Sequence, residues 1–167
     1  VLKGNGHQIS HDAIRQGFAM VNWPCRMEVL DLGTESPLVV VDGAHNPYSA
    51  ARLCDSLGKY FKYNKVVLIA GISQDKNLDG IVSELARMRP QVIAAQSRHP
   101  RAVAPSVLVK AFMDYGIRAT GVEGTSDALD QAMACTSKDD IILATGSLFI
   151  AAEVKEAIKG IKSEIYP

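Results

Sequence analysis

The sequence predicts an α/β fold, a Rossmann-like three-layer sandwich around a mainly parallel sheet of six strands. Short apolar runs alternate along the chain with amphipathic segments of about 10–15 residues, which is the pattern of βαβ units. Several runs are continuously apolar, as expected of strands that are covered on both faces. The length of 167 residues, with 47% hydrophobic and 22% charged residues, suits one globular domain.

The first part of the chain predicts two helices and two strands. The Ser10 hydroxyl suits the N-cap of a first helix, which carries Ile14, Phe18 and Val21 on one side and ends before Trp23. The moderate alternation of the next segment indicates a strand at an edge of the sheet, where it can run antiparallel, and the apolar run after it indicates a buried strand. After the first helix, the predicted elements are strand Arg26–Leu30, polar turn Asp31–Pro37, strand Leu38–Val41 and helix Asn46–Phe61.

The rest of the chain repeats the alternation of strand and helix. Each apolar run is followed by a polar turn and then by apolar residues at helical spacing. The tail, Lys159–Pro167, shows no strong pattern. The predicted elements are strand Lys65–Gly71, a helix with the apolar stripe Leu78, Ile81, Val82, Leu85 and Met88, strand Gln91–Ala95, helix Ala104–Tyr115, strand Arg118–Val122, helix Ser126–Cys135, strand Asp140–Ala144 and helix Leu148–Ile158.

Composition argues against several classes of partner. Eighteen basic and eighteen acidic residues cancel, which speaks against a nucleic-acid or anionic-membrane surface. No apolar stretch approaches the roughly 20 residues of a membrane span, and no secretory leader is apparent.

Three widely spaced cysteines form neither a disulfide framework nor a metal motif, and we expect Cys54 and Cys135 to be small buried hydrophobes. We therefore predict a cytoplasmic protein. Because the chain begins at Val1 without methionine, we expect it to be part of a longer protein.

Four strand-to-helix turns carry polar side chains, and we expect them to meet along one edge of the sheet. Right-handed crossovers bring the carboxyl ends of parallel strands to the same side, where open α/β sheets bind their ligands. The N–H groups that begin the following helices point there too and favour anions. The four turns are Asp42–Asn46, Ser73–Lys76, Ser97–Arg101 and Thr145–Ser147.

The turn that follows strand Leu38–Val41 is the strongest candidate site. Asp42 could bind ribose hydroxyls, hold a metal or act as a base, and its structural alternative is an Asx turn or a helix cap. His45 could orient a substrate carboxylate or transfer a proton, and its alternative is a capping or packing histidine. Because an acid, a glycine, an imidazole and an amide follow a buried strand directly, we favour function for both. Asn46-Pro47 is expected to cap and begin the helix.

The other three turns are weaker candidates. Ser73 and Asp75-Lys76 lie on the turn after strand Lys65–Gly71, and such a turn is usually just solvated. Lys76 could contact a phosphate or a carboxylate, and Asp75 could cap the next helix. The segment 98–101, with two arginines and a histidine, could bind an anion or be a solvated loop. Residues 145–147 could form an anion-binding nest or a helix cap. The sequence contains no P-loop, no Gly-x-Gly-x-x-Gly after a strand, no Gly-x-Ser-x-Gly and no HExxH or paired-cysteine metal motif.

Taken in order, these motifs resemble folylpolyglutamate synthase/dihydrofolate synthase, a branch of the Mur ligase superfamily. Residues 23–28 read W-P-C-R-M-E, where the family has W-P-G-R-L-E, and residues 42–47 read D-G-A-H-N-P as in the family. Asp75-Lys76, residues 100–102 and residues 145–148 match the family's D-K-D, P-R-A and T-G-S-L. The first two blocks together are specific, whereas the short motifs alone would be weak.

The resemblance implies a domain organisation. Enzymes of this family have a larger N-terminal part with a P-loop and magnesium ligands, and a smaller Rossmann-like C-terminal part that closes over the nucleotide and the incoming amino acid. Residues 1–22 would then be the connecting segment, and residues 23–167 the C-terminal domain. Its partner would be the N-terminal P-loop ATPase domain of the same polypeptide. That domain would provide most of the contacts to ATP and Mg²⁺.

The resemblance also implies a reaction and site residues. ATP would phosphorylate a folate carboxylate to an acyl phosphate, which the amino group of glutamate then attacks. By this analogy Arg26 reaches the ATP phosphates, Asp42 contacts the nucleotide, and His45 lies by the incoming glutamate. Ser73 and Asp75-Lys76 would help to bind that glutamate. The chain alone is expected to be inactive.

Three departures from the family pattern concern details of nucleotide contact. Cys25 replaces the usual glycine before Arg26, the turn at 31–36 is long, and Asn77 stands where D-K-D has its second acid. Two other functions stay open at this point. One is a free-standing Rossmann-like module that binds a nucleotide or a regulatory ligand without chemistry. The other is the C-terminal domain of a cell-wall Mur ligase.

Overall fold

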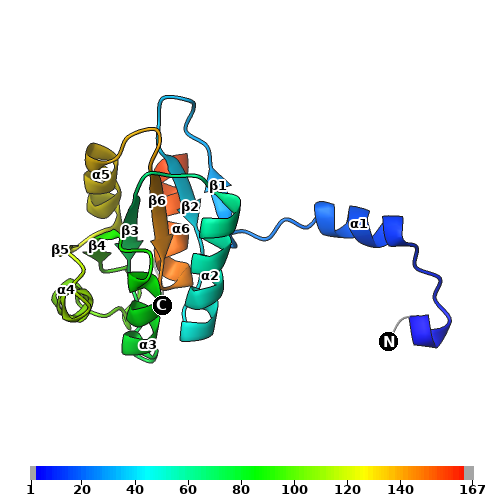
Figure 1. The fold of residues 1–167 in the computed structure, drawn as a ribbon, viewed down its shortest axis with the longest axis horizontal. Helices are drawn as coiled ribbons and strands as arrows, with labels where there is room; N and C mark the ends of the chain where they lie inside the picture. Colours follow the sequence, from blue (N-terminus) through cyan, green and yellow to red (C-terminus); the bar gives the residue numbers. More distant parts are fainter. Residues whose placement is uncertain (1–2, 164–167) are drawn as a thin grey trace.

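Six strands form one mixed sheet in the computed structural model, which describes residues 3–163 (Figure 1). Strand β1 (Glu28–Leu30) lies at an edge and runs antiparallel to β2, whereas the other neighbouring strands are parallel. The predicted fold class, with its antiparallel edge strand, is therefore confirmed. In spatial order the strands are β1, β2 (Leu38–Val41), β6 (Ile141–Thr145), β3 (Val66–Ala70), β4 (Gln91–Ala95) and β5 (Ala119–Val122).

Five helices cover the sheet in two layers. Three of them pack into one core cluster and the other two into a second cluster. The first layer consists of α2 (Pro47–Tyr60), α3 (Leu78–Ala86) and α4 (Pro105–Asp114), and the second of α5 (Thr125–Cys135) and α6 (Leu148–Lys159).

The central strands are almost entirely apolar because their side chains pack into both core clusters. Val40, Leu68 and Leu143 pack in the cluster with α2, α3 and α4, whereas Val39 and Ile142 pack in the cluster with α5 and α6. Successive side chains of a strand point to opposite faces of the sheet. A strand that is covered on both faces is therefore apolar at nearly every position. All five side chains are fully buried.

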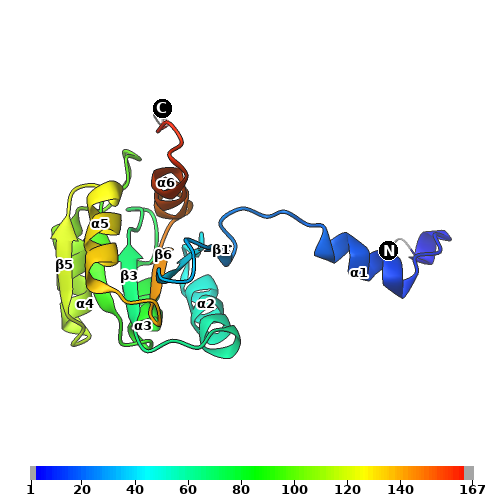
Figure 2. The ribbon, with the colours of Figure 1, turned by 90° about the horizontal axis from the view of Figure 1, so that it is seen from above.

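Helix α1 (His11–Ala19) begins as predicted, but it buries nothing within the described residues. The Ser10 hydroxyl accepts a hydrogen bond from the Ala13 N–H at 3.0 Å, which confirms the N-cap. The helix stands away from the sheet in both views, preceded by a 3-10 turn, η1 (Lys3–Asn5) (Figures 1 and 2). Ile14, Phe18 and Val21, which form the predicted apolar side, are 38%, 78% and 56% exposed, so this side lacks a cover in the described structure.

Strand β1 is shorter than the predicted Arg26–Leu30. Cys25 and Met27 have φ angles of 56° and 42°, in the left-handed region that L side chains rarely adopt. The chain therefore turns around Arg26 and pairs with β2 only from Glu28. Most other predicted ends agree with the structure within one residue.

Two of the three cysteines lie in the cores. Cys54 is buried as predicted, and Cys25 is buried as well. The prediction for Cys135 was wrong, because it lies half-buried at the end of α5, where its sulfur is 3.6 Å from Nε2 of Gln91. Within residues 3–163 no helix combines the length and the apolarity that a membrane crossing requires.

A buried carboxylate directly before β6 predicts that the stability of the domain depends on pH. Asp140 accepts hydrogen bonds from the Ser137 N–H at 2.7 Å and the Ser137 hydroxyl at 2.8 Å, and lies 3.7 Å from the Lys65 ammonium. Burial alone would raise the pKa of Asp140, but these partners outweigh it and lower the pKa below its ordinary value. Stabilisation from a lowered pKa is full above the unfolded-state pKa and is lost as the pH falls through the folded-state pKa.

We therefore expect Asp140→Asn to lower the free energy of unfolding by about 2 kcal/mol at pH 7, and by progressively less below about pH 4. Urea denaturation of the wild type and of Asp140→Asn between pH 7 and pH 3 measures this difference in the free energy of unfolding. Asp139→Asn is the matched control, since Asp139 is exposed and adjacent, and it should stay close to the wild type. If the difference in the free energy of unfolding between Asp140→Asn and the wild type does not change with pH, the interpretation is contradicted.

Candidate functional site

The four polar turns meet at the carboxyl ends of the parallel strands, as predicted. The Asp42 N–H donates to the Ala144 carbonyl at 3.0 Å, and the Gly146 N–H donates to the Ala44 carbonyl at 3.1 Å. These bonds join the turn after β2 to the turn after β6. The turns after β3 and β4 are joined by the Gln74 N–H, which donates to the Arg101 carbonyl at 2.8 Å. The strand order places the two pairs side by side along one rim of the sheet.

Asp42 is a structural residue that also lines a hollow. Its Oδ1 accepts the Ala44 N–H and its Oδ2 accepts the Met27 N–H, both at 2.8 Å. The bond to Ala44 has the Asx-turn geometry that was the structural alternative for this residue. Asp42 as a whole is only 8% exposed, yet it lines a hollow of about 290 Å³ beside α2. Because a carboxylate offers about four acceptor positions, these two bonds leave room for a ligand.

Arg26 lines the same hollow from the strained turn that precedes β1. Its side chain is exposed, and its guanidinium carbon lies 5.7 Å from the ring centroid of Trp23. Cys25, on one side of it, takes the left-handed φ that a glycine would adopt without strain. The family pattern's glycine thus suits this backbone, and Cys25 adopts the same turn at a conformational cost.

Helix α2 forms the opposite wall of this hollow. Tyr48, Ser49, Arg52, Leu53 and Ser56 line it from successive turns of the helix. The guanidinium carbon of Arg52 lies 5.8 Å from the centroid of the Tyr48 ring. Sequence reasoning missed these residues, although their spacing of three or four marks one face of a helix.

His45 lies between β2 and α2, half-buried, with a defined tautomer. Its Nδ1 is 2.8 Å from the Gly43 carbonyl oxygen, which can only accept, so Nδ1 carries the proton. In the neutral ring Nε2 is then the acceptor. The helix after it begins as predicted, because Asn46 Oδ1 accepts the Ser49 N–H at 2.8 Å and Pro47 is the first helical residue.

Ser73 and Lys76 line a second hollow, of about 390 Å³, between the turn after β3 and the start of α4. Ser73 is buried and Lys76 is half-buried. The Lys76 ammonium lies 2.9 Å from Asp75, whose exposed carboxylate is also 3.9 Å from Arg101. The hydrogen bond with Lys76 lowers the pKa of Asp75 below its ordinary value. Of the predicted site residues, Arg26 and Asp42 therefore line the first hollow and Ser73 and Lys76 the second, whereas His45 and Asp75 line neither.

The structure corrects the capping role considered for Asp75. Asn77 caps α3, with its Oδ1 accepting the Gly80 N–H at 2.9 Å. Asn77 is the residue that replaces the second acid of the family's D-K-D. No local signal in the sequence distinguishes Asp75 from Asn77, because both side chains can cap a helix.

The remaining two candidate turns interact with helix α6: residues of the turn after β4 contact its side chains, and the turn after β6 caps its N-terminus. Arg98 donates its backbone N–H to the buried Glu153 at 2.9 Å and pairs with Glu156 at 2.6 Å, so its charge is balanced within the fold. The His99 ring stacks on Phe149 with centroids 4.0 Å apart. Ser147 Oγ accepts the Ile150 N–H at 3.2 Å, which is the cap alternative for that turn.

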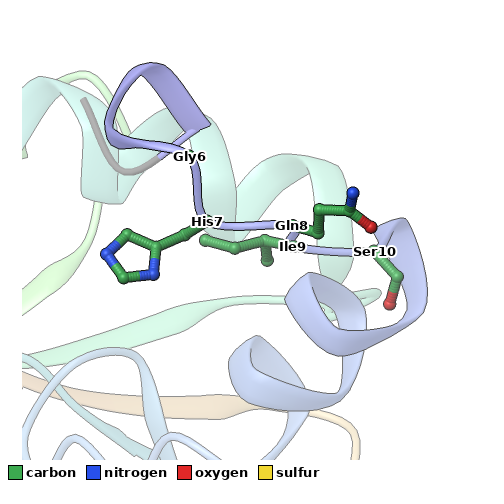
Figure 3. A pocket seen from close by; sticks show the side chains of 5 residues that line it. All are labelled: Gly6, His7, Gln8, Ile9 and Ser10. Carbon is green, nitrogen blue, oxygen red and sulfur yellow. The ribbon is translucent and has the colours of Figure 1, made fainter.

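A hollow of about 500 Å³ elsewhere in the molecule carries no site. It is lined by five consecutive residues, Gly6–Ser10, at the bend before α1 (Figure 3). Among residues 3–163, no three His, Cys, Asp or Glu side chains are grouped so that they could hold a metal ion.

Comparison with known proteins adds relatives with named activities. Residues 25–148 match the family described as "Mur ligase, glutamate ligase domain". A Haloferax volcanii protein, "Probable bifunctional folylpolyglutamate synthase/dihydropteroate synthase", is 34% identical over 88% of this chain and 17% of its own length. The "Dihydrofolate synthase/folylpolyglutamate synthase" of Escherichia coli is 28% identical over 97% of this chain and 37% of its own length.

Solved structures of such enzymes share the fold. Escherichia coli FolC in complex with DHPP and ADP has a TM-score of 0.85 at 28% identity, over 97% of this chain and 37% of that one. The Yersinia pestis folylpolyglutamate synthase/dihydrofolate synthase complexed with AMPPNP and Mn ion has a TM-score of 0.83 at 28% identity, over 95% and 37% of the two chains. The chain thus spans little more than a third, or less, of the length of these relatives.

Two glycines with positive φ test how tightly the rim is packed. At Gly146 (φ 101°) a Cβ would lie 2.8 Å from the Gly71 carbonyl oxygen, whereas at Gly116 (φ 70°) nothing lies within 4 Å. Gly116→Ala should therefore add only left-handed strain, about 1 kcal/mol, and Gly146→Ala should lower the free energy of unfolding by about 3 kcal/mol or more. Urea denaturation measures both values. Equal losses would show that the turns after β3 and β6 are not in close contact.

Proposed function

The chain belongs to the Mur ligase glutamate ligase domain family, and on this basis we propose that it is the C-terminal part of an ATP-dependent ligase that adds glutamate to a folate carboxylate. The observation that carries the proposal is the shared hollow of Arg26 and Asp42, which brings the family's first two motifs together. The named activities of the relatives favour folate over a cell-wall precursor. A free-standing binding module explains the fold but not this conjunction of motifs.

The reaction we propose proceeds through an acyl phosphate. A carboxylate is a poor electrophile, so the γ-phosphoryl group of ATP is first transferred to a carboxylate oxygen and ADP is released. The amino group of glutamate then attacks the carbonyl carbon and loses a proton. The bond from carbon to the phosphate oxygen breaks, and inorganic phosphate leaves as the amide forms.

We assign the nucleotide to the side of Arg26 and Asp42. An exposed guanidinium at the edge of a hollow suits phosphate oxygens, because arginine donates in a fork that matches them. No carboxylate within the described residues pairs with it in an ion pair. Asp42 offers its remaining lone pairs to hydroxyl groups. A bound Mg²⁺ would neutralise phosphate charge, and we propose that ligands outside this chain supply most of its coordination.

We assign the incoming glutamate to His45, Ser73 and Lys76. With Nδ1 bonded to Gly43, neutral His45 presents an acceptor, Nε2, which suits the amino group that must lose a proton. Lys76 and the Ser73 hydroxyl suit carboxylate oxygens. Asp75 sets the position of the Lys76 ammonium through their ion pair.

The proposed partner is the N-terminal P-loop ATPase part of the same polypeptide, with residues 1–22 as the connecting segment and residues 23–167 as the C-terminal domain. The uncovered apolar side chains of α1 support a connecting role, since they need a surface to pack against. The same proposal includes the cytoplasmic location expected of folate metabolism.

Removing the Arg26 guanidinium should impair the intact enzyme. We expect Arg26→Ala to reduce the turnover number about 10²- to 10³-fold, because it deletes a charged donor to the transferring phosphate. ADP release coupled to glutamate and folate measures the rate. Arg118→Ala is the control, because Arg118 is exposed and precedes β5, at the opposite end of the strands. Near-normal turnover of Arg26→Ala would remove Arg26 from the proposed mechanism.

The 167-residue chain should by itself neither hydrolyse ATP nor form a folyl-glutamate bond. Its sequence has no P-loop to hold the triphosphate. Inorganic phosphate and product mass measured with purified chain, ATP, Mg²⁺, folate and glutamate provide the test. Glutamate-dependent release of phosphate would refute the assignment as part of a larger site.

A further inference from the structure

We propose that Glu28 and Lys155 are positioning residues, which hold the Trp23–Met27 turn and thereby place the Arg26 guanidinium. The inference rests on the function proposed above for Arg26. It adds two residues that do not line the hollow and that act through the backbone of the turn.

Glu28 fixes one side of the turn. Its Oε2 accepts the Cys25 N–H at 2.9 Å, and the Lys155 ammonium lies 2.9 Å from Oε2 and 2.7 Å from Oε1. The two side chains are only 23% and 20% exposed, so solvent and salt weaken this pair less than a surface ion pair. The carboxylate thus joins a backbone amide of the turn to a lysine of α6, 127 positions away.

The rim of the sheet fixes the other side of the turn. Asp42 accepts the Met27 N–H at 2.8 Å, and the Gly43 N–H donates to the Cys25 carbonyl at 2.8 Å. Arg26 is therefore the residue between two anchored neighbours. The two carboxylates hold the backbone N–H groups of these neighbours, Cys25 and Met27, while the Arg26 side chain stays exposed.

The turn needs such anchors because its backbone is strained. Both neighbours of Arg26 are non-glycine residues with left-handed φ, and such conformations persist only where the surroundings enforce them. The adjoining strand is only three residues long and lies at the edge of the sheet, so its own ladder contributes little. Burial alone would raise the pKa of Glu28, but the bonds from Lys155 and Cys25 lower it below its ordinary value, which keeps the anchor charged near neutral pH.

The test begins with Lys155→Met, which keeps the length of the side chain and removes its charge. Lys110→Met is the control, because it removes the same charge from an exposed position on α4, which packs in the other core cluster. Trp23 is the only tryptophan and belongs to the turn, so its fluorescence anisotropy and its quenching by acrylamide report on the turn directly. We expect lower anisotropy and stronger quenching in Lys155→Met alone, with unchanged far-UV circular dichroism.

The intact enzyme provides the functional readout. Lys155→Met should lower kcat/KM for ATP by about 10- to 100-fold, as expected when a catalytic group is misplaced, and KM for glutamate should not change. Lys155→Arg should restore most of the loss, because it restores the charge. In the Arg26→Ala background Lys155→Met should have no further effect, since it acts through Arg26. Lys155→Gln serves as the second variant if Lys155→Met does not fold.

The outcomes separate the two proposals. If Arg26→Ala is impaired but Lys155→Met and Lys155→Gln behave like the wild type in activity and in Trp23 fluorescence, the positioning inference is overturned and the function of Arg26 stands. The positioning inference is also overturned if the losses in kcat/KM caused by Arg26→Ala and Lys155→Met are additive in the double variant. If Arg26→Ala is as active as the wild type, the proposed role of Arg26 falls, and with it the functional part of the inference.

Discussion

Both oxygens of the Asp42 carboxylate accept a backbone N–H, and this pair of bonds fixes the geometry of the candidate site. One bond shapes the turn that ends β2, and the other brings the turn around Arg26 to the same rim. Without the carboxylate, two N–H groups in a largely buried place would lose their partner. Because the same side chain lines the hollow with Arg26, its structural and functional interpretations are not alternatives. The residue that builds the site is also positioned to contact a ligand.

Much of the fold was predictable from sequence because its strongest signals are local. Strand Leu38–Val41 has the predicted bounds, since a strand covered on both faces is apolar along its whole length. Strand Gln91–Ala95 also has the predicted bounds, although it begins at the polar, exposed Gln91. The caps at Ser10 and Asn46 follow from hydroxyl and amide chemistry at helix starts. The start of β1 was not predictable, because neither Cys25 nor Met27 has a side chain that favours left-handed φ. The turn is held in part by Asp42 and Gly43, which no pattern within residues 23–28 reveals.

The candidate site shows the same division between local and distant information. Parallel topology alone places the four polar turns on one rim, and the structure confirms this. What each side chain does there depends on residues elsewhere in the chain. Arg98 is neutralised by acids of α6, which no pattern in the loop reveals, and the pair of Glu28 and Lys155 spans 127 positions. The sequence could identify candidates at the rim, but only the packing of α6 shows which of them are already paired.

In the proposed enzyme, this arrangement explains why the strained turn is anchored to a sheet and not left as a mobile loop. A reactive acyl phosphate must be kept from water, so the site has to be completed by closure of another part of the polypeptide. Arg26 is exposed and would meet the phosphates only across that interface. If the turn became ordered only on closure, the entropy of ordering it would oppose binding. Anchoring by Asp42 and Glu28 orders it during folding instead. The conformational cost at Cys25 and Met27 is then borne by the stability of the domain, and closure brings together surfaces that already have their final shape.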